Sequence, residues 1–254
     1  MIKNALQEPT IKDNYRGASH GLTTFSVLDW LALAFFGLAW AGYQVAAEST
    51  AGRSRSLNVL MNEQRHRWIE QMVRRDNRIL DVNINASLQN GTAFFASASL
   101  IALGAALTLL RSTDDALHLL SEMPFGLPTS RLAWELKVLG LTVIFGYAFY
   151  KFAWSYRLFN YAAILIGAVV PHDDPALGPA EARRAANMNV TAGRHFTRGL
   201  QAFFFALAYL GWFIGPWVLI GSTAIVLIIV WRRQFSSDAL TALSDLEPLG
   251  QSKK

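Results

Sequence analysis

One segment limits the fold of this chain more than any other: residues 202–231 run for thirty positions without a charged side chain. Residues 25–47 carry one acidic side chain, 92–110 carry no charge, and 132–152 carry charges only near their ends. A helix needs about 20 apolar residues to cross a bilayer core, and it satisfies its own backbone hydrogen bonds in lipid. A soluble bundle would need a polar face on each helix, which 202–231 lacks. The sequence therefore predicts an all-α integral membrane helical bundle with about four transmembrane helices.

The remaining composition supports this prediction and excludes several kinds of chemistry. Only 16% of the residues are charged, against about 25% in soluble domains. The chain has no cysteine, which excludes disulfides, thiolate metal sites and cysteine nucleophiles. Residues 1–24 form a polar tail without a recognisable signal peptide, so 25–47 is expected to remain as a span, and 236–254 form a second polar tail. No catalytic motif is recognised, so neither enzyme activity nor a cofactor is expected.

The arginines indicate which loops lie in the cytoplasm. Loop 48–91 has seven arginines and loop 153–200 has five, whereas the short loop 111–131 has two, offset by acidic residues. The positive-inside rule places the two long loops on the cytoplasmic side. With four spans, both termini then lie on the opposite side, although Arg232 and Arg233 directly after the last span weaken this assignment. The net charge of +5 is attributed to anchoring and to anionic lipid headgroups, and not to nucleic acid.

The first long loop contains an amphipathic helix that leads into the second span. From Met61 to Asn90 there is no proline or glycine, and apolar residues recur on one helical face. Gly91 is the only break before the span, so the helix is expected to join the span continuously or through a bend there. The apolar face consists of Met61, Trp68, Met72, Ile79 and Leu80.

Polar side chains crowd the junction between this helix and the second span. Many of them fall on one or two adjacent faces of a helix, and an unpaired buried polar group costs about 1–3 kcal/mol. Two interpretations stay open: an interfacial collar that ties neighbouring helices together, or the mouth or lining of a polar pathway. The candidate residues are Asp76, Asn77, Arg78, Asp81, Asn83, Asn85, Ser87, Gln89, Asn90 and Ser97.

The third apolar segment continues beyond the thickness of a bilayer. A helix over 132–169 would contain 38 residues and measure about 57 Å, so it must bend or project. We expect 161–170 to be a short interfacial or re-entrant piece, and Lys151 and Arg157 to anchor the helix among aromatic residues at the headgroups. In the alternative interpretation Lys151 lies deeper and pairs with a carboxylate, for which the candidates are Asp76, Asp81 and Asp29.

Basic residues of the two long loops form a candidate cationic rim that contacts lipid phosphates or other anions. No metal site is expected, because the acidic and histidine cluster after Pro171 stands in a turn without a second ligand cluster. That cluster is His172, Asp173 and Asp174. The members of the cationic rim are Arg74, Arg75, Lys151, Arg157, Arg194, His195 and Arg198.

Small residues mark helix surfaces that pack closely in membranes. We expect them to pack within one chain rather than across a dimer interface. Pro216 is expected to bend the fourth span, because it removes the hydrogen bond to the carbonyl of Trp212. The packing residues are Ala98, Ala102 and Ala106 on the second span, and Gly211 and Gly215 on the fourth.

Four stretches of the sequence occur in the same order in a known family: "LDWLALAFFGLAWAGY", "RDNRILDVNINASLQNGTAFFASASLIALG", "YKFAWSYRLFNYAAILIGA" and "AGRHFTRGLQAFFFALAYLGWF". From about Leu28 to Phe235 the chain resembles the domain-of-unknown-function family 599 of bacterial and plant membrane proteins. The resemblance implies a protein with several spans, usually drawn with four. It implies no activity, cofactor or catalytic residue.

Two functions remain as hypotheses. The first is an oligomeric channel or transporter for ions or small solutes, suggested by the polar residues of the junction. The second is a non-catalytic membrane subunit or scaffold that docks a partner protein or anionic lipid through its arginine-rich loops. Either protein is expected in the inner (plasma) membrane of a bacterium, in contact with anionic headgroups and with homo-oligomer formation possible.

Overall fold

The computed structural model describes residues 25–48, 56–122, 130–169 and 178–244, and these are helical almost throughout. The prediction of an all-α membrane bundle is confirmed by this architecture. Within the described residues the helices are α2 (Val27–Glu48), α4 (Leu57–Met72), α5 (Ile79–Arg111), α6 (Thr113–Glu122), α7 (Arg131–Ala168), α8 (Gly178–Tyr209), α9 (Gly211–Ile214), α10 (Pro216–Phe235) and α11 (Asp238–Ser244).

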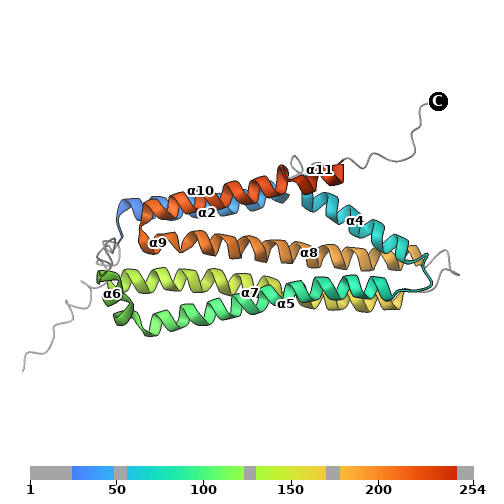
Figure 1. Ribbon diagram of the computed structural model, residues 1–254, viewed down its shortest axis with the longest axis horizontal. Coiled ribbons are helices and arrows are strands. Elements are labelled where there is room, and N and C mark those ends of the chain that lie inside the picture. The colour runs from blue at the N-terminus through green and yellow to red at the C-terminus, as the bar shows by residue number, and fades with distance from the viewer. Residues whose placement is uncertain (1–24, 49–55, 123–129, 170–177, 245–254) are drawn as a thin grey trace, which may run out of the picture.

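The helices form one elongated bundle with two different halves (Figure 1). The halves meet where the rings of Phe95 and Phe152 stack, with centroids 5.5 Å apart, and where Gly199 contacts Phe152. On one side lies the apolar half, which comprises α2, α9, α10 and residues 95–111, 131–152 and 199–209. On the other side lies the projecting half, which comprises α4 and residues 79–94, 153–168 and 178–198.

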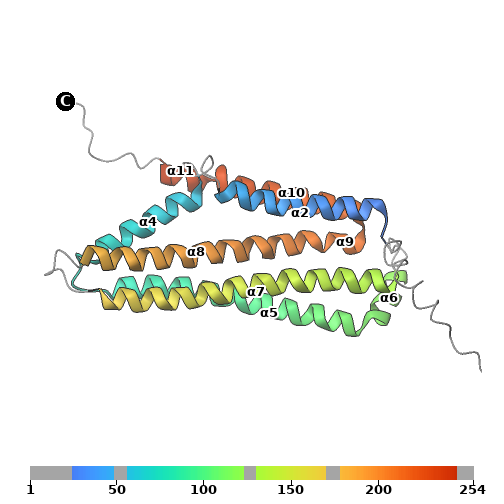
Figure 2. The same cartoon turned by 180° about the vertical axis from the view of Figure 1, so that it is seen from behind.

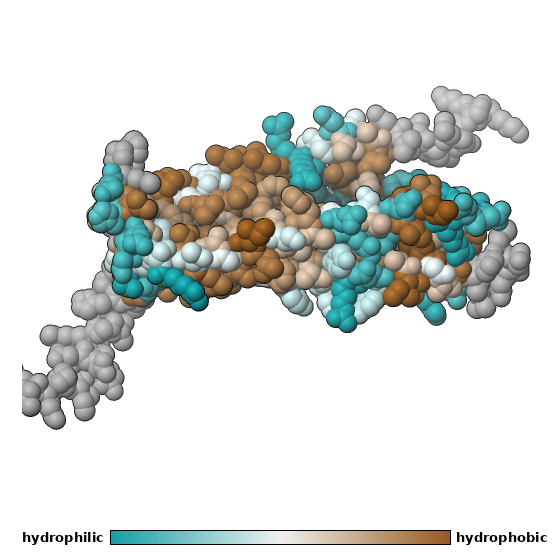
Figure 3. Space-filling view, turned by 60° about the horizontal axis from the view of Figure 1, so that its bottom comes forward, coloured by the Kyte–Doolittle hydropathy of each residue, from teal (hydrophilic) through white to brown (hydrophobic). Residues whose placement is uncertain are grey.

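The apolar half presents hydrophobic side chains to its surroundings. Leu31, Leu38 and Val45, each seven residues apart on α2, are 60%, 73% and 70% exposed, and Ile101 on α5 is 74% exposed. Figure 3 shows apolar surface concentrated over this half, with polar residues at its end and over much of the projecting half. Four helical stretches are long and apolar enough to cross a membrane: Val27–Ala47, Ile79–Arg111, Arg131–Ala168 and Pro216–Leu243. The chain is a multi-pass integral membrane protein.

Helices α7 and α8 run antiparallel through both halves and form the spine of the bundle (Figures 1 and 2). Gly199 allows α8 to lie against the ring of Phe152, since a Cβ atom there would come 2.9 Å from a ring carbon. The expected 38-residue helix is confirmed, and it projects beyond the apolar half instead of bending. The expected re-entrant piece at 161–170 is wrong, because Ile166 is buried against Ile69 and Met72 in the projecting half.

The small residues expected on the second span face this spine. Ala106 is buried with Trp134 and Val138 of α7. Ala102 packs against the core cluster of the apolar half, and Ala98 is partly buried. Ala102 and Ala106 therefore serve packing within one chain, where a small side chain lets α5 approach α7.

The amphipathic helix of the first long loop is interrupted earlier than the sequence suggested. Helix α4 ends at Met72, and α5 begins at Ile79 and passes through Gly91 without a break. At the interruption the side chain of Asn77 accepts a hydrogen bond of 2.9 Å from the backbone N–H of Ile79, and such local bonds compete with helix formation. Because the helix does not continue, Ile79 and Leu80 are exposed. Met61 is exposed as well, so the predicted apolar face is correct only at Trp68 and Met72.

The expected fourth span, 202–231, is not one helix. Helix α8 ends at Tyr209, the short α9 follows, and Pro216 starts α10 as its first residue, a position where its missing N–H costs nothing. The Ser222 hydroxyl donates a 2.7 Å hydrogen bond to the Ala208 carbonyl, so α10 returns alongside α8. The expectation of a bend at Pro216 is wrong because the chain reverses there.

The two expected packing glycines of this segment lie in the reversal. Gly211 approaches the backbone of Val218, because a Cβ atom on it would meet the Val218 carbonyl oxygen at 3.0 Å. Gly215 is the extended residue between α9 and α10. Gly211 therefore packs the hairpin of one chain, while Gly215 forms its turn, and the two do not lie on one helix face.

This hairpin changes how the chain passes through the apolar half. The hydroxyl of Tyr43, near the end of α2, donates to the carbonyl of Val230, near the end of α10, so α2 and α10 run parallel. Residues 199–209 run antiparallel beside them, so the apolar half contains α2, α10 and this end of α8 in addition to the segments of α5 and α7 (Figure 2). The first and last described helices consequently begin and end at opposite ends of this half. The expectation that both termini share one side follows from treating 202–231 as a single span.

Candidate functional site

Asp81, one of the expected collar residues, is fully buried at the start of α5. Its Oδ1 atom accepts hydrogen bonds from Trp68 Nε1 at 2.7 Å and from Arg75 Nη1 at 2.9 Å. The ion pair with Arg75 spans the interruption between α4 and α5. Asp81 therefore ties α4 to α5 at the far end of the projecting half.

Two amides of α5 tie this helix to α7 and α8. Asn85 Nδ2 donates to the Phe159 carbonyl at 3.1 Å, and Asn85 Oδ1 accepts from Asn189 Nδ2 at 3.3 Å. Gln89 Nε2 donates to Asn160 Oδ1 at 2.7 Å. These side chains are engaged between helices in the projecting half, as a collar requires, and the expected position of that collar at the membrane interface stays a prediction.

The other collar candidates lie elsewhere on the surface of the molecule. Arg78 donates from Nη1 to the carbonyls of Ile166 and Val169, at 3.2 and 2.7 Å, and so caps the end of α7. The exposed face of α5 continues into the apolar half through Phe94 and Ile101, so it does not stay polar. The exposed candidates are Asp76, Asn77, Asn83, Ser87, Asn90 and Ser97.

The expected cationic rim is divided between the two ends of the projecting half. Arg78, beside Arg74 and Arg75, contacts Ile166, whereas Arg198 adjoins Gly199, which touches Phe152. Fourteen residues of α7 separate Ile166 from Phe152, which is about 21 Å along a helix. Arg74 and Arg75 therefore lie far from the second group, which consists of Arg194, His195 and Arg198.

Lys151 and Arg157 make contacts with tyrosine rings of α7. The ammonium of Lys151 lies 5.1 Å from the Tyr147 ring centroid and 5.8 Å from that of Tyr150. The Arg157 guanidinium donates to the Tyr161 hydroxyl at 2.6 Å. Among the ion pairs of the described residues none involves Lys151, so the alternative interpretation, with an aspartate partner, is not supported.

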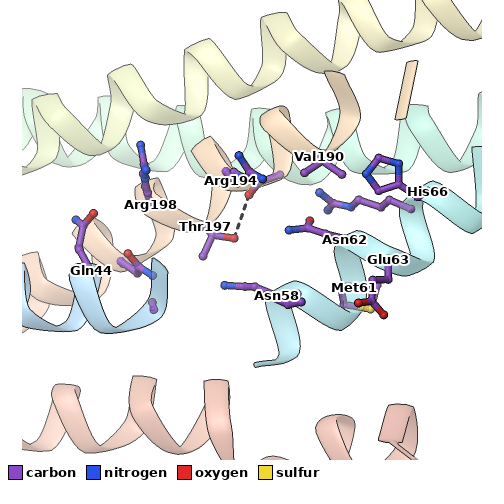
Figure 4. A pocket seen from close by; sticks show the side chains of 15 residues that line it. Gln44, Asn58, Met61, Asn62, Glu63, His66, Val190, Arg194, Thr197 and Arg198 are labelled. Carbon is purple, nitrogen blue, oxygen red and sulfur yellow. Dashed lines mark hydrogen bonds between the residues drawn. The ribbon is translucent and has the colours of Figure 1, made fainter. Parts of the chain in front are cut away.

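A cavity of about 520 Å³ opens where the two halves meet, between α2, α4 and α8. We call it the junction pocket. In Figure 4, Asn62 points from α4 toward Thr197 and Arg194 of α8, and Gln44 approaches from α2. Ten of the fifteen residues that line it are polar, and it lies at the level where α2 ends. Its polar side chains are Gln44, Asn58, Asn62, Glu63, Arg65, His66, Arg194, Thr197, Arg198 and Gln201.

Arg65 is the half-buried cation of this pocket. Its Nη1 atom donates to the carbonyl oxygen of Asn189 at 3.3 Å. The guanidinium lies directly over Gly193, where a Cβ atom would collide with it. No carboxylate in the described part of the chain pairs with Arg65. Burial lowers the pKa of the Arg65 guanidinium, so the site holds a desolvated positive charge that lacks an acidic partner.

The rest of the lining adds charge and hydrogen-bond donors. Arg194 and Arg198 follow one another by one turn of α8, and Glu63 is the one acidic residue that lines the pocket. Three arginines and one glutamate give a formal charge of +2. Guanidinium groups and amides donate hydrogen bonds, so the arrangement suits an anion that also carries polar groups.

His195 lies next to the pocket on α8. Its Nδ1 atom is buried and makes no hydrogen bond to the described residues. Burial lowers the pKa of the His195 imidazole, and the positive charges of Lys151 and Arg198 lower it further. The lowered pKa favours the neutral imidazole, so on α8 the positive charge that lines the pocket comes from Arg194 and Arg198.

The sequence interpretation found only Arg194 and Arg198 among the polar residues that line the pocket. Arg65 had one available signal: it stands four and seven residues before Ile69 and Met72, the buried residues of α4, and so lies on their face. The amides carried no signal, because α2, α4 and α8 come together only in the folded chain. The missed polar residues are Gln44, Asn58, Asn62, Glu63, Arg65, His66, Thr197 and Gln201.

The described residues contain no group of three side chains suited to a metal ion. The cluster His172, Asp173 and Asp174 lies outside the described residues.

A family model described as "Protein of unknown function, DUF599" matches residues 31–239. This match confirms the resemblance seen in the sequence. No curated protein and no solved structure matches the chain.

Proposed function

The chain belongs to the DUF599 family of proteins of unknown function, and we propose that it is a non-catalytic membrane protein that binds anionic lipid headgroups in the junction pocket. The observation that carries this proposal is the half-buried Arg65, which lines a cavity of formal charge +2 and has no carboxylate partner among the described residues. A buried charge is costly without a counter-charge. A bound anion supplies one.

The position of the pocket favours a ligand from the membrane. Gln44 and Ala47 line it from the last turns of α2, which lies in the apolar half. Arg232 and Arg233 stand in the last turn of α10 at the same end. Lipid phosphates gather at this depth, where basic side chains attract anionic headgroups. A headgroup can therefore reach the pocket while its acyl chains stay beside the apolar half.

The arginine distribution supports a cytoplasmic position for the projecting half. Because α10 returns alongside α8, Arg232 and Arg233 end on the same side as α4 and the start of α5. In the sequence, Arg232 and Arg233 weakened the assignment of the long loops to the cytoplasm. Because of the hairpin these two arginines lie on the same side as the long loops, so they now support that assignment. In this orientation the pocket lies at the inner surface of a plasma membrane, where the negative charge of anionic lipids attracts its arginines.

Transport by a channel or carrier is less well supported. Asp81, Asn85 and Gln89 are engaged in bonds between helices. The outward face of α5 becomes apolar at Phe94 and Ile101. A pathway lined by this face would require further copies of the chain. Flux through proteoliposomes that depends on Asn83 or Asn90 would favour this second function.

Lipid retention by the purified protein tests the proposal. The protein is extracted in mild detergent, and the lipids that remain bound are quantified by mass spectrometry. We expect anionic lipids to be enriched over zwitterionic ones, and the enrichment to fall in the double variant Arg65→Gln and Arg194→Gln. The control is Arg67→Gln with Arg183→Gln, which removes the same charge from the same two helices at positions that do not line the pocket. Equal retention in both double variants would contradict the proposal.

A further inference from the structure

We propose that the junction pocket is specific for a phosphomonoester whose remaining part carries hydroxyl groups. This inference rests on the proposed function and deepens it by naming the chemical class of the headgroup. The inference names the phosphate and the group attached to it, and it applies both to a phosphomonoester in a lipid headgroup and to one in a soluble molecule.

The charge of the pocket favours a phosphomonoester over a phosphodiester. Three arginines and Glu63 leave a formal charge of +2. A phosphomonoester carries about −1.5 to −2 at neutral pH, whereas the phosphodiester of an ordinary phospholipid carries one negative charge. Since a partly buried site is most stable when its charge is matched, the monoester fits and the diester leaves a residual positive charge.

The arrangement of the arginines suits the three terminal oxygens of a monoester. Arg65 comes from α4, and Arg194 and Arg198 come from α8 on the facing wall. A guanidinium has five N–H donors, and Arg65 uses Nη1 for its hydrogen bond to the Asn189 carbonyl. Its other donors make no hydrogen bond within the described residues. Arginine binds phosphate through paired, charge-assisted hydrogen bonds.

Gly193 is the residue that gives Arg65 this position. The guanidinium lies over its Cα atom, in space that any side chain on Gly193 would occupy. The atom that a Cβ would displace is the far end of a flexible side chain, so Gly193→Ala is expected to shift Arg65 without unfolding α8. This variant changes the geometry of the pocket and leaves its charge unaltered.

The size and the amides of the pocket indicate what is attached to the phosphate. Binding cavities for small molecules measure about 300–1,000 Å³, and this one, at about 520 Å³, has room for more than a bare phosphate. The walls of the remaining space carry four side-chain amides, which donate and accept hydrogen bonds and so pair with hydroxyl groups of a glycerol or sugar. These amides are Gln44, Asn58, Asn62 and Gln201.

Binding measurements with defined probes test the inference. The protein is placed in nanodiscs of phosphatidylcholine alone, or with phosphatidylinositol 4-phosphate as a lipid that carries a phosphomonoester on a hydroxyl-bearing ring, or with phosphatidylinositol as the matched lipid that carries the same ring and only a phosphodiester. Stabilisation against heat is measured for each composition. In parallel, glycerol 3-phosphate and inorganic phosphate are titrated calorimetrically into the phosphatidylcholine nanodiscs at constant ionic strength. We expect monoesters to bind about tenfold more tightly than the diester, and glycerol 3-phosphate more tightly than inorganic phosphate.

The variants connect this preference to the pocket. Arg65→Gln and Gly193→Ala should each weaken monoester binding about tenfold or more, since each removes a charge-assisted contact. Arg67→Gln and Arg183→Gln, at exposed positions, should leave it unchanged. A monoester preference that is the same in all four variants would overturn the inference, because the ligand would then bind elsewhere.

The probes separate failure of this inference from failure of the proposed function. If phosphatidylinositol 4-phosphate and phosphatidylinositol bind equally and both depend on Arg65, lipid binding stands and the monoester inference is overturned. If glycerol 3-phosphate binds through Arg65 while neither lipid does, the monoester inference stands and lipid binding is overturned. If no probe depends on Arg65, both are overturned.

Discussion

The ammonium of Lys137 donates a hydrogen bond of 2.8 Å to the carbonyl oxygen of Trp212. In a continuous helix this carbonyl would accept from residue 216, but that residue is Pro216, which has no N–H. Lys137 is 7% exposed and also lies over the Trp212 ring, 5.1 Å from its centroid. The Trp212 indole in turn donates to Asp29 at 2.8 Å. A lysine from α7 thus satisfies the carbonyl at which the chain reverses.

Removing this lysine is predicted to destabilise the hairpin. Lys137→Met leaves the Trp212 carbonyl without its partner and Asp29 without a nearby cation, at a cost of about 1–3 kcal/mol. Thermal unfolding of the purified protein in detergent measures the loss. Lys151→Met is the control on the same helix, since the ammonium of Lys151 contacts tyrosine rings. Equal losses of stability in the two variants would show that the hydrogen bond to the Trp212 carbonyl contributes no more than the contacts of Lys151.

The hairpin also predicts that the two ends of the described chain lie on opposite sides of the membrane. Because the natural chain has no cysteine, single cysteines can be labelled without background. Ser26→Cys and Asp115→Cys should react with an impermeant maleimide from one side, and Ser236→Cys from the other. Labelling of all three from the same side would mean that residues 199–209 do not cross the membrane with α10.

The division of the polar face of α5 predicts different consequences for two neighbouring asparagines. Asn85 is buried and bonded to Phe159 and Asn189, whereas Asn83 is exposed. Asn85→Leu should lower the free energy of unfolding by about 1–3 kcal/mol, because two partners lose a hydrogen bond inside the bundle. Asn83→Leu should change it by less than about 0.5 kcal/mol. Denaturant unfolding of the two variants compares them directly, and similar losses would refute the assignment of the inner face.

The position of His195 predicts acid sensitivity. Its pKa in the folded protein lies below the ordinary value of 6.5, so the unfolded chain takes up the proton first as the pH falls. Stability is therefore unaffected well above pH 6.5 and decreases as the pH drops below it. His195→Gln should reduce the stability lost between pH 7.5 and 5.5, measured by thermal unfolding. His118→Gln, at an exposed position of α6, should not, and an unchanged loss in His195→Gln would contradict the prediction.

The candidate site was only partly predictable from the sequence. Arg194, His195 and Arg198 could be grouped because they are close in the sequence, and the structure keeps them together. Arg74 and Arg75 were joined to them only by sharing a side of the membrane, and in the structure fourteen residues of α7 separate the two groups. Arg65 was missed because its partner surface, Gly193 and the Asn189 carbonyl, lies more than 120 residues away along the chain.

By itself the sequence determined that the chain forms helices and that much of their surface meets lipid. Long uncharged segments such as 92–110 leave no other way to satisfy the backbone in a hydrocarbon layer. Only the tertiary structure decided how often the chain crosses and where its charges gather. The apolar run 202–231 is compatible with a bent helix or with a hairpin, because both bury the same side chains. The hairpin is stabilised by contacts from outside the run, among them the hydrogen bond from Lys137 to Trp212.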